Sequence, residues 1–106
     1  MIEIEQGGGN VYADLGVEQA DEMLVKARLA SKIGEIIKHR HLSQQQAAEI
    51  LGMTQPKLSN MLRGRFRGIS EAKMMECLAR LGRDVQIVVS LARDKQHGGR
   101  IEVVFA

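Results

Sequence analysis

The stretch LSQQQAAEILGMTQPKLSNMLRGRFR, residues 42–67, decides the fold of this chain. Ser43 is a favourable N-cap residue and predicts a helix over 44–51, which Gly52 ends because glycine readily takes the left-handed conformation that closes a helix. Thr54 caps a second helix over 55–62, and Pro56 lies in its first turn, where a missing N–H costs nothing. Two short helices joined by a turn of about three or four residues make a helix-turn-helix.

The apolar residues of this stretch assign an inner and an outer side to each helix. The side chains expected to be buried are Ala47, Ala48, Ile50, Leu51, Met53, Leu58, Met61 and Leu62. The outer side of the second helix then carries Gln55, Pro56, Lys57, Ser59 and Asn60. Most of these side chains offer donors and acceptors that match base edges in a DNA major groove.

Residues beside this face have the chemistry for phosphate contacts. Gln44 begins the first helix, where backbone N–H groups and the helix dipole favour an anion, and Arg63, Arg65 and Arg67 follow the second helix. The candidate DNA-binding residues are Gln44, Gln45, Thr54, Gln55, Pro56, Lys57, Ser59, Asn60, Arg63 and Arg65. The alternative is a small helical domain that uses the same geometry only for packing and whose basic face is merely solvated.

The net charge of +2 conceals a strong asymmetry along the chain. Residues 1–25 hold no Lys or Arg and carry the acids Glu3, Glu5, Asp14, Glu18, Asp21 and Glu22. Residues 38–67 carry Lys38, Arg40, Lys57, Arg63, Arg65 and Arg67 against the single acid Glu49. The positive charge therefore collects on the helix-turn-helix, as binding to a phosphate backbone requires.

Length and composition predict one domain with an aliphatic core. The chain has 106 residues, 44% of them hydrophobic, with six Met, no Trp and 3% aromatic residues. Cys77 is the single cysteine, which excludes an internal disulfide and a cysteine-based zinc cage, and we expect it to be buried and inert. No apolar run is long enough to span a bilayer and no signal peptide is visible, so we expect no membrane partner and a cytoplasmic location.

Two more helices are predicted around the central pair. Apolar residues recur at helical spacing over 17–39, with a stripe at Met23, Ala27, Ala30, Ile33 and Ile37. Ser70 is expected to cap a last helix, with an inner face of Met74, Met75, Leu78 and Leu81, that ends at Gly82. The spacing of His39 and His41 does not suit a metal site on one helix, so we expect no metal and no cofactor.

The two ends of the chain differ from its helical centre. Residues 1–16 are predicted to be an N-terminal extension, with a flexible joint at Gly7–Gly9 rather than a phosphate loop. Residues 17–82 would form the DNA-binding domain. Residues 83–106 would form two strands, because apolar residues alternate over 85–91 and 100–105. A lone strand pair is marginal in water, so we expect a homodimer in which two copies cover each other and place their recognition helices about 34 Å apart on DNA.

The pattern of Gln44, Ala48, Gly52, Leu58 and Met61 resembles the Xre/Cro-repressor type of helix-turn-helix domain. This resemblance implies a mainly α, four-to-five-helix, lambda-repressor-like fold, here with a C-terminal pair of β-strands. The runs NVYADLG (10–16), LSQQQAAEILGMTQPKLSNMLRGR (42–65) and LARLGRDVQIVV (78–89) are similar to small HigA-like regulators. Many of those regulators are antitoxins paired with a RelE/HigB-type toxin.

The resemblance also implies roles for individual residues. The family residue that matches Gln44 contacts phosphate, and those that match Gln55, Pro56, Lys57 and Asn60 face the bases. Pro56 departs from the wider class, in which many members carry a second polar reader at this position. It offers only an apolar contact, such as one to a thymine methyl group.

The predicted function is that of a sequence-specific transcriptional regulator, an autorepressing antitoxin-like protein that binds a palindromic operator on double-stranded DNA as a dimer. The alternative is primarily a protein-interaction antitoxin that neutralises a RelE/HigB-type ribonuclease toxin. The acidic segment 3–22 of this chain carries the negative charge that would attract a basic partner, although a solvated acidic helix start explains the same residues. The sequence shows no nucleophile–base pair, no paired carboxylates and no cofactor loop, so we do not expect an enzyme. It shows no aromatic platform for stacking bases, so we do not expect RNA binding.

Overall fold

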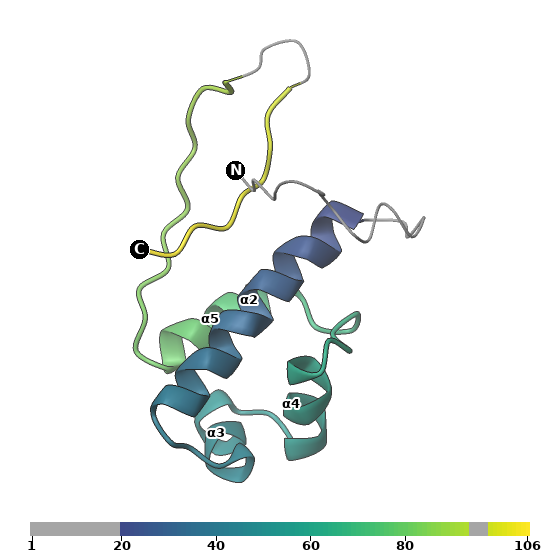
Figure 1. The fold of residues 1–106 in the computed structure, drawn as a ribbon, viewed down its shortest axis with the longest axis vertical. Coiled ribbons are helices and arrows are strands. Elements are labelled where there is room, and N and C mark those ends of the chain that lie inside the picture. Colours follow the sequence, from purple (N-terminus) through teal and green to yellow (C-terminus); the bar gives the residue numbers. More distant parts are fainter. Residues whose placement is uncertain (1–19, 94–97) are drawn as a thin grey trace. The chain divides into compact units, whose positions relative to one another are not determined.

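A computed structural model describes residues 20–93 and 98–106 of the chain. It contains the helices α2 (Ala20–His39), α3 (Gln44–Leu51), α4 (Gln55–Leu62) and α5 (Glu71–Arg80), shown in Figure 1. The bounds of α3 and α4 confirm the predicted helix-turn-helix. The predictions made for the N-terminal extension, for the glycine joint and for a helix start at residue 17 lie outside the described residues.

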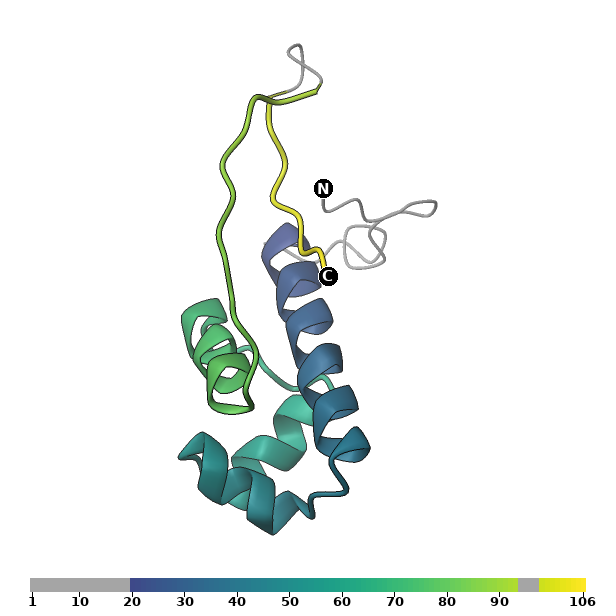
Figure 2. The same cartoon turned by 90° about the vertical axis from the view of Figure 1, so that its left-hand side faces the viewer.

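Residues 26–85 form one compact unit, in which α3 contacts both α4 and α5. Figures 1 and 2 show α3 and α4 at the C-terminal end of α2, with α5 running beside α2. A Cβ added to Gly34 would lie 3.3 Å from Leu62 Cδ2, so the glycine lets α4 approach α2 closely. The long helix is therefore the support against which the helix-turn-helix packs.

The core of this unit is aliphatic and Met-rich, as the composition predicts. Ala30, Ile33 and Ile37 of the predicted α2 stripe are buried, whereas Ala27 is half-buried. The largest fully buried side chains are Ile33, Ile36, Leu51, Leu58, Met61, Met74 and Cys77. Burying one such aliphatic side chain contributes about 1.5–3 kcal/mol, so these few residues supply a large part of the driving force for folding.

The helix ends follow the local chemistry expected of them. Ser43 Oγ accepts the Gln46 N–H at 3.1 Å, and Gln46 Oε1 accepts the Ser43 N–H at 2.9 Å, which completes a capping box. Ser70 caps α5 by accepting the Lys73 N–H at 3.0 Å. Gly82 follows α5 with φ +91, the left-handed conformation predicted for it.

The C-terminal residues contain no strand within 83–93 and 98–106. Most of their large apolar side chains are exposed, including 91% of Val89 and 89% of Leu91. A strand needs a hydrogen-bonded partner, which the alternating sequence pattern alone does not supply. The predicted β-strand pair is thus not confirmed in the described residues. Among those residues, no helix is both long and apolar enough to cross a membrane.

Candidate nucleic-acid interface

The outer face of α4 begins at its capped N-terminus. Thr54 is extended, with φ −74 and ψ 154, and its Oγ1 accepts the Lys57 N–H at 3.3 Å. Gln55, Pro56 and Lys57 follow as the first turn, and all three are exposed. The cap satisfies one N–H of the helix terminus and leaves the side chains of that turn pointing outward.

The inner face of α4 anchors this surface. Leu58 and Met61 are 0% exposed, so the helix has one fixed orientation about its own axis. Ser59 and Asn60 are half-buried at the edge of the outer face. Asn60 Oδ1 accepts a hydrogen bond from Arg63 Nη2 at 3.2 Å, which orients the amide group one turn behind Lys57.

Basic residues follow α4 directly. Gly64 has φ +91, and the Arg65 N–H donates to the carbonyl of Asn60 at 2.8 Å, which turns the chain away from the helix. Arg63, Arg65 and Arg67 are exposed, whereas the intervening Phe66 is 2% exposed. Phe66 therefore anchors a loop whose cationic neighbours remain in solvent. Sequence reasoning missed this anchor, although the alternation in Arg-Phe-Arg is the signal that could have shown it.

Gln44 and Gln45 are exposed in the first turn of α3. Helix N-termini carry partial positive charge and unpaired N–H groups, so the N–H groups of this turn can donate to a phosphate oxygen. All ten predicted DNA-contact residues thus lie on α3, on α4 or immediately beside them, and none of them is buried.

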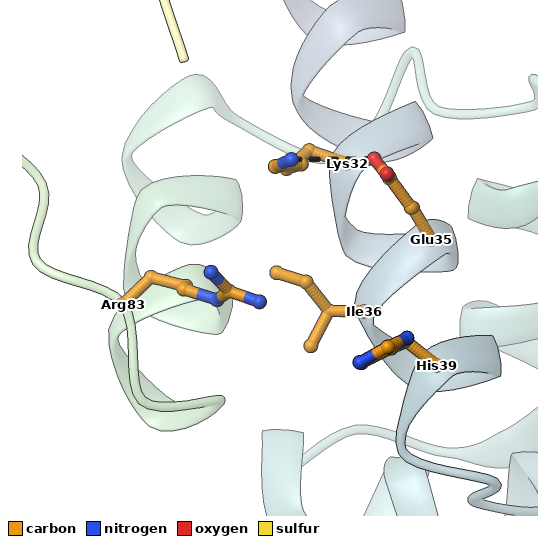
Figure 3. A pocket seen from close by; sticks show the side chains of 5 residues that line it. All are labelled: Lys32, Glu35, Ile36, His39 and Arg83. Atoms are coloured by element: carbon orange, nitrogen blue, oxygen red, sulfur yellow. Dashed lines mark hydrogen bonds and ion pairs between the residues drawn. The ribbon is translucent and has the colours of Figure 1, made fainter. Parts of the chain in front are cut away.

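One hollow of about 200 Å³ lies elsewhere in the same unit, between α2 and the turn after α5 (Figure 3). Lys32, Glu35, Ile36, His39 and Arg83 line it, and Lys32 Nζ pairs with Glu35 Oε1 at 3.3 Å. No residue of α3 or α4 lines this hollow, so it is separate from the outer face of α4. Among the described residues, no cluster of three His, Cys, Asp or Glu side chains could hold a metal ion.

Cys77 is buried on the inner face of α5, as predicted. Burial raises the pKa of its thiol, and the cationic Lys73 only partly opposes that effect. A thiol held in its protonated form is a poor nucleophile, so the environment of Cys77 matches a packing role.

Comparison with known proteins agrees with this geometry. A family described as "Helix-turn-helix domain" matches residues 11–90. A solved structure named "Putative XRE Family Transcriptional Regulator" is similar to this chain at 37% identity with a TM-score of 0.76. The match covers 82% of this chain and 98% of that one. No curated protein matches the chain. The shared helices, the matched length and the identity together show that the chain belongs to the helix-turn-helix family of XRE-type DNA-binding transcriptional regulators.

Proposed function

We propose that this regulator reads a specific operator with the outer face of α4. The observation that carries this proposal is the division of α4 into two sides. Leu58 and Met61 are completely buried, while Gln55, Pro56 and Lys57 are exposed on the first turn of the helix. Amide and ammonium groups at the start of a recognition helix are well suited to base edges in the major groove.

The proposed contacts divide into base reading and phosphate binding. Gln55, Lys57 and Asn60 would donate to or accept from base edges, with Ser59 beside them. Pro56 would offer an apolar contact to a thymine methyl group. The phosphate contacts would come from Gln44, Gln45, Thr54, Arg63 and Arg65.

The proposed functional unit is a homodimer on a palindromic operator. Support comes from the C-terminal segments, where Ile87, Val88, Val89 and Leu91 are all strongly exposed. Pairing these segments between two copies would bury apolar surface and satisfy the backbone groups of both segments. A two-fold dimer also presents two α4 helices to half-sites one helical turn apart, which is why the operator would be palindromic.

The second candidate function is that of a HigA-like antitoxin that represses its own operon and binds a RelE/HigB-type toxin. The observation that favours it is the acidic N-terminal segment, since residues 1–25 contain no Lys or Arg. Opposite charge speeds the encounter with a basic partner and selects for it. Co-expression with a small basic protein encoded beside this gene should yield a stable complex. Toxicity that this chain does not relieve would contradict the antitoxin role.

The operator proposal is tested by fluorescence anisotropy. The DNA just upstream of the gene is compared with a random duplex of equal length across a salt series. Replacing Lys57 or Asn60 with Ala should weaken operator binding by about 1–3 kcal/mol and random-duplex binding much less. Arg83→Ala is the matched control, because it removes an exposed cation outside α3 and α4.

Each other outcome has a definite meaning. Equal losses on the operator and on the random duplex would make Lys57 and Asn60 phosphate contacts and overturn their reading role. If the protein binds neither duplex, the operator proposal fails. Light scattering that shows a monomer at micromolar concentration, even with operator DNA present, would exclude the dimer.

A further inference from the structure

The turn that leads into α4 begins at the C-terminus of α3. The last four carbonyl groups of a helix have no intrahelical partners. Two of these groups are satisfied by the turn itself. The Gly52 N–H donates to the Glu49 carbonyl at 3.3 Å, and the Met53 N–H donates to the Ala48 carbonyl at 3.1 Å. The carbonyls of Ile50 and Leu51 are the remaining two.

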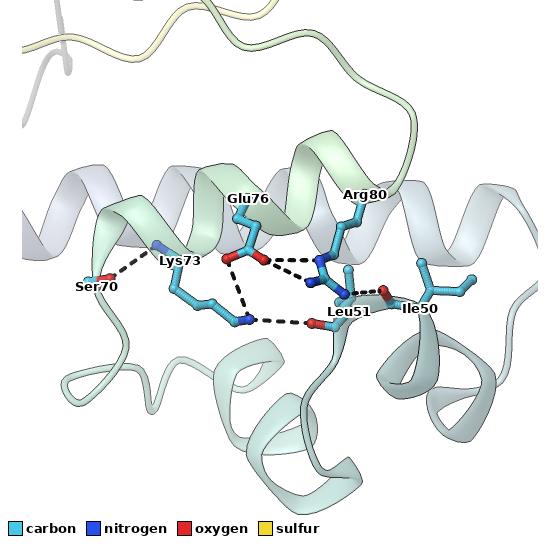
Figure 4. Close-up of polar contacts among 6 residues, drawn as sticks. All are labelled: Ile50, Leu51, Ser70, Lys73, Glu76 and Arg80. Carbon is cyan, nitrogen blue, oxygen red and sulfur yellow. Dashed lines mark hydrogen bonds and ion pairs between the residues drawn. The ribbon is translucent and has the colours of Figure 1, made fainter.

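Helix α5 supplies the partners of those remaining carbonyls, as Figure 4 shows. Arg80 Nη1 donates to the Ile50 carbonyl at 3.2 Å, and Lys73 Nζ donates to the Leu51 carbonyl at 3.4 Å. Cations are favoured here because a helix C-terminus carries partial negative charge. The end of α3 is therefore completed by side chains from a helix some 20 to 30 residues further along the chain.

Glu76 holds both cations in place. Its Oε2 accepts from Arg80 Nε and pairs with Arg80 Nη2, each at 3.0 Å, and its Oε1 lies 3.7 Å from Lys73 Nζ. The three residues are spaced three and four apart, so they lie on one face of α5. We call Lys73, Glu76 and Arg80 the α5 clamp.

The ion pairs within the α5 clamp contribute little to stability by themselves, because all three side chains are partly exposed and solvent screens them. Their effect is to keep the Lys73 and Arg80 side chains directed at the carbonyls of α3. The bonds to Ile50 and Leu51 attach the residues immediately before the turn to α5, and that turn leads directly into Thr54, the cap of α4.

We propose that the α5 clamp is a specificity-determining positioning device, which sets the angle at which α4 meets the DNA without touching the DNA itself. Base contacts demand accurate placement, whereas contacts between flexible cations and phosphate tolerate displacement. Loosening the α5 clamp should therefore weaken operator binding more than random-duplex binding. This inference rests on the proposed reading role of α4.

The test compares Arg80→Ala, Arg80→Lys and Glu76→Gln with wild type. Lys32→Ala is the matched control, because it removes the cation of an i,i+3 ion pair within α2. Arg80→Ala should lower the ratio of operator to random-duplex affinity about five- to tenfold, with an unchanged salt slope on the random duplex. Arg80→Lys should restore part of the ratio, and Lys32→Ala should leave it unchanged.

A second measurement needs no DNA. Amide hydrogen exchange at Met53, Lys57 and Leu58 should quicken in Arg80→Ala and not in Lys32→Ala, while thermal unfolding checks that both variants are folded. If wild type does not prefer its operator, the proposed function has failed, and the exchange rates alone decide the positioning role.

Two results would overturn the proposal. One is a lower unfolding temperature in Arg80→Ala with an unchanged affinity ratio and unchanged exchange in the turn, which would make the α5 clamp a stabiliser only. The other is an equal loss on both duplexes with a reduced salt slope, which would make Arg80 a phosphate contact.

Discussion

Lys26 Nζ donates a hydrogen bond to the backbone carbonyl of Arg67, 41 residues further along the chain, at 3.3 Å. The Lys26 side chain is only 4% exposed, which is unusual for a lysine. Its bond ties α2 to the loop that follows α4 and carries Arg65 and Arg67. The support helix thus fixes the basic loop as well as the apolar core.

Lys26→Ala should destabilise the fold by about 1–3 kcal/mol, because it removes a buried stem and leaves the Arg67 carbonyl without this donor. Lys26→Met should lose less, since it keeps the apolar stem. Urea unfolding followed by circular dichroism measures both. The control is Lys38→Ala, which truncates an exposed lysine on the same helix and should change stability by less than about 0.5 kcal/mol. An equally small change in Lys26→Ala would contradict the anchoring role.

Phe66→Ala should cost about 3–5 kcal/mol, because it empties a site in which the ring is almost wholly buried. Phe66→Leu fills part of that space and should cost less, so it serves where the alanine variant does not fold. The leucine variant should also bind DNA more weakly at low salt, since the loop that holds Arg65 and Arg67 loosens. Unchanged stability in both variants would show that Phe66 is not an anchor.

Gly52→Ala should destabilise the protein more than Gly82→Ala. Both glycines have positive φ, 68 and 91, so each substitution carries a backbone cost of about 1–2 kcal/mol. A Cβ at position 52 would also lie 3.0 Å from Arg80 Nη1, whereas nothing lies within 4 Å at position 82. The added Cβ should displace the guanidinium from the Ile50 carbonyl.

A double-mutant cycle isolates that second effect. In an Arg80→Ala background, Gly52→Ala should cost no more than Gly82→Ala, because the displaced group is already absent. If the difference between the two glycines persists without Arg80, the contact with the guanidinium is not its cause.

Stability should fall at alkaline pH partly through Cys77. Burial raises the pKa of the folded thiol above that of the unfolded chain, so the folded state keeps its proton when the unfolded state loses one. This contribution is fully present below the unfolded pKa and is lost as the pH rises through the folded pKa. Urea unfolding between about pH 7 and 10 should therefore show a steeper decline for wild type than for Cys77→Ala. Parallel declines would show that the thiol does not contribute.

The helix ends were the most predictable part of the fold. Ser43, Thr54 and Ser70 cap helices, and Gly52 and Gly82 end them, as the sequence predicts. Each such signal is contained in four or five consecutive residues, so no knowledge of distant contacts is needed. On the predicted outer face of α4, Gln55, Pro56 and Lys57 are exposed while Ser59 and Asn60 are half-buried, and the contacts of this face with DNA stay a prediction.

Features that depend on distant partners were not predictable. The Lys73 backbone N–H donates to Ser70 Oγ, while its ammonium group donates to the Leu51 carbonyl. No local pattern indicates that second contact. Phe66 is a core residue inside a basic loop, and its place between two arginines is the one local signal of its burial, since a loop has no helical or strand periodicity. The alternating C-terminal residues have strand propensity, but pairing depends on which chain lies opposite.

Oxidants reach the buried thioethers of Met61 and Met74 only when the core of this regulator opens. Both side chains are 0% exposed, one on the inner face of α4 and the other on α5. A sulfoxide formed during a transient opening is polar and cannot return to an aliphatic core without cost. Each oxidation event would then convert a reversible opening into lasting damage. The rate at which Met61 and Met74 themselves are oxidised in the folded protein therefore measures how often the core beneath α4 opens.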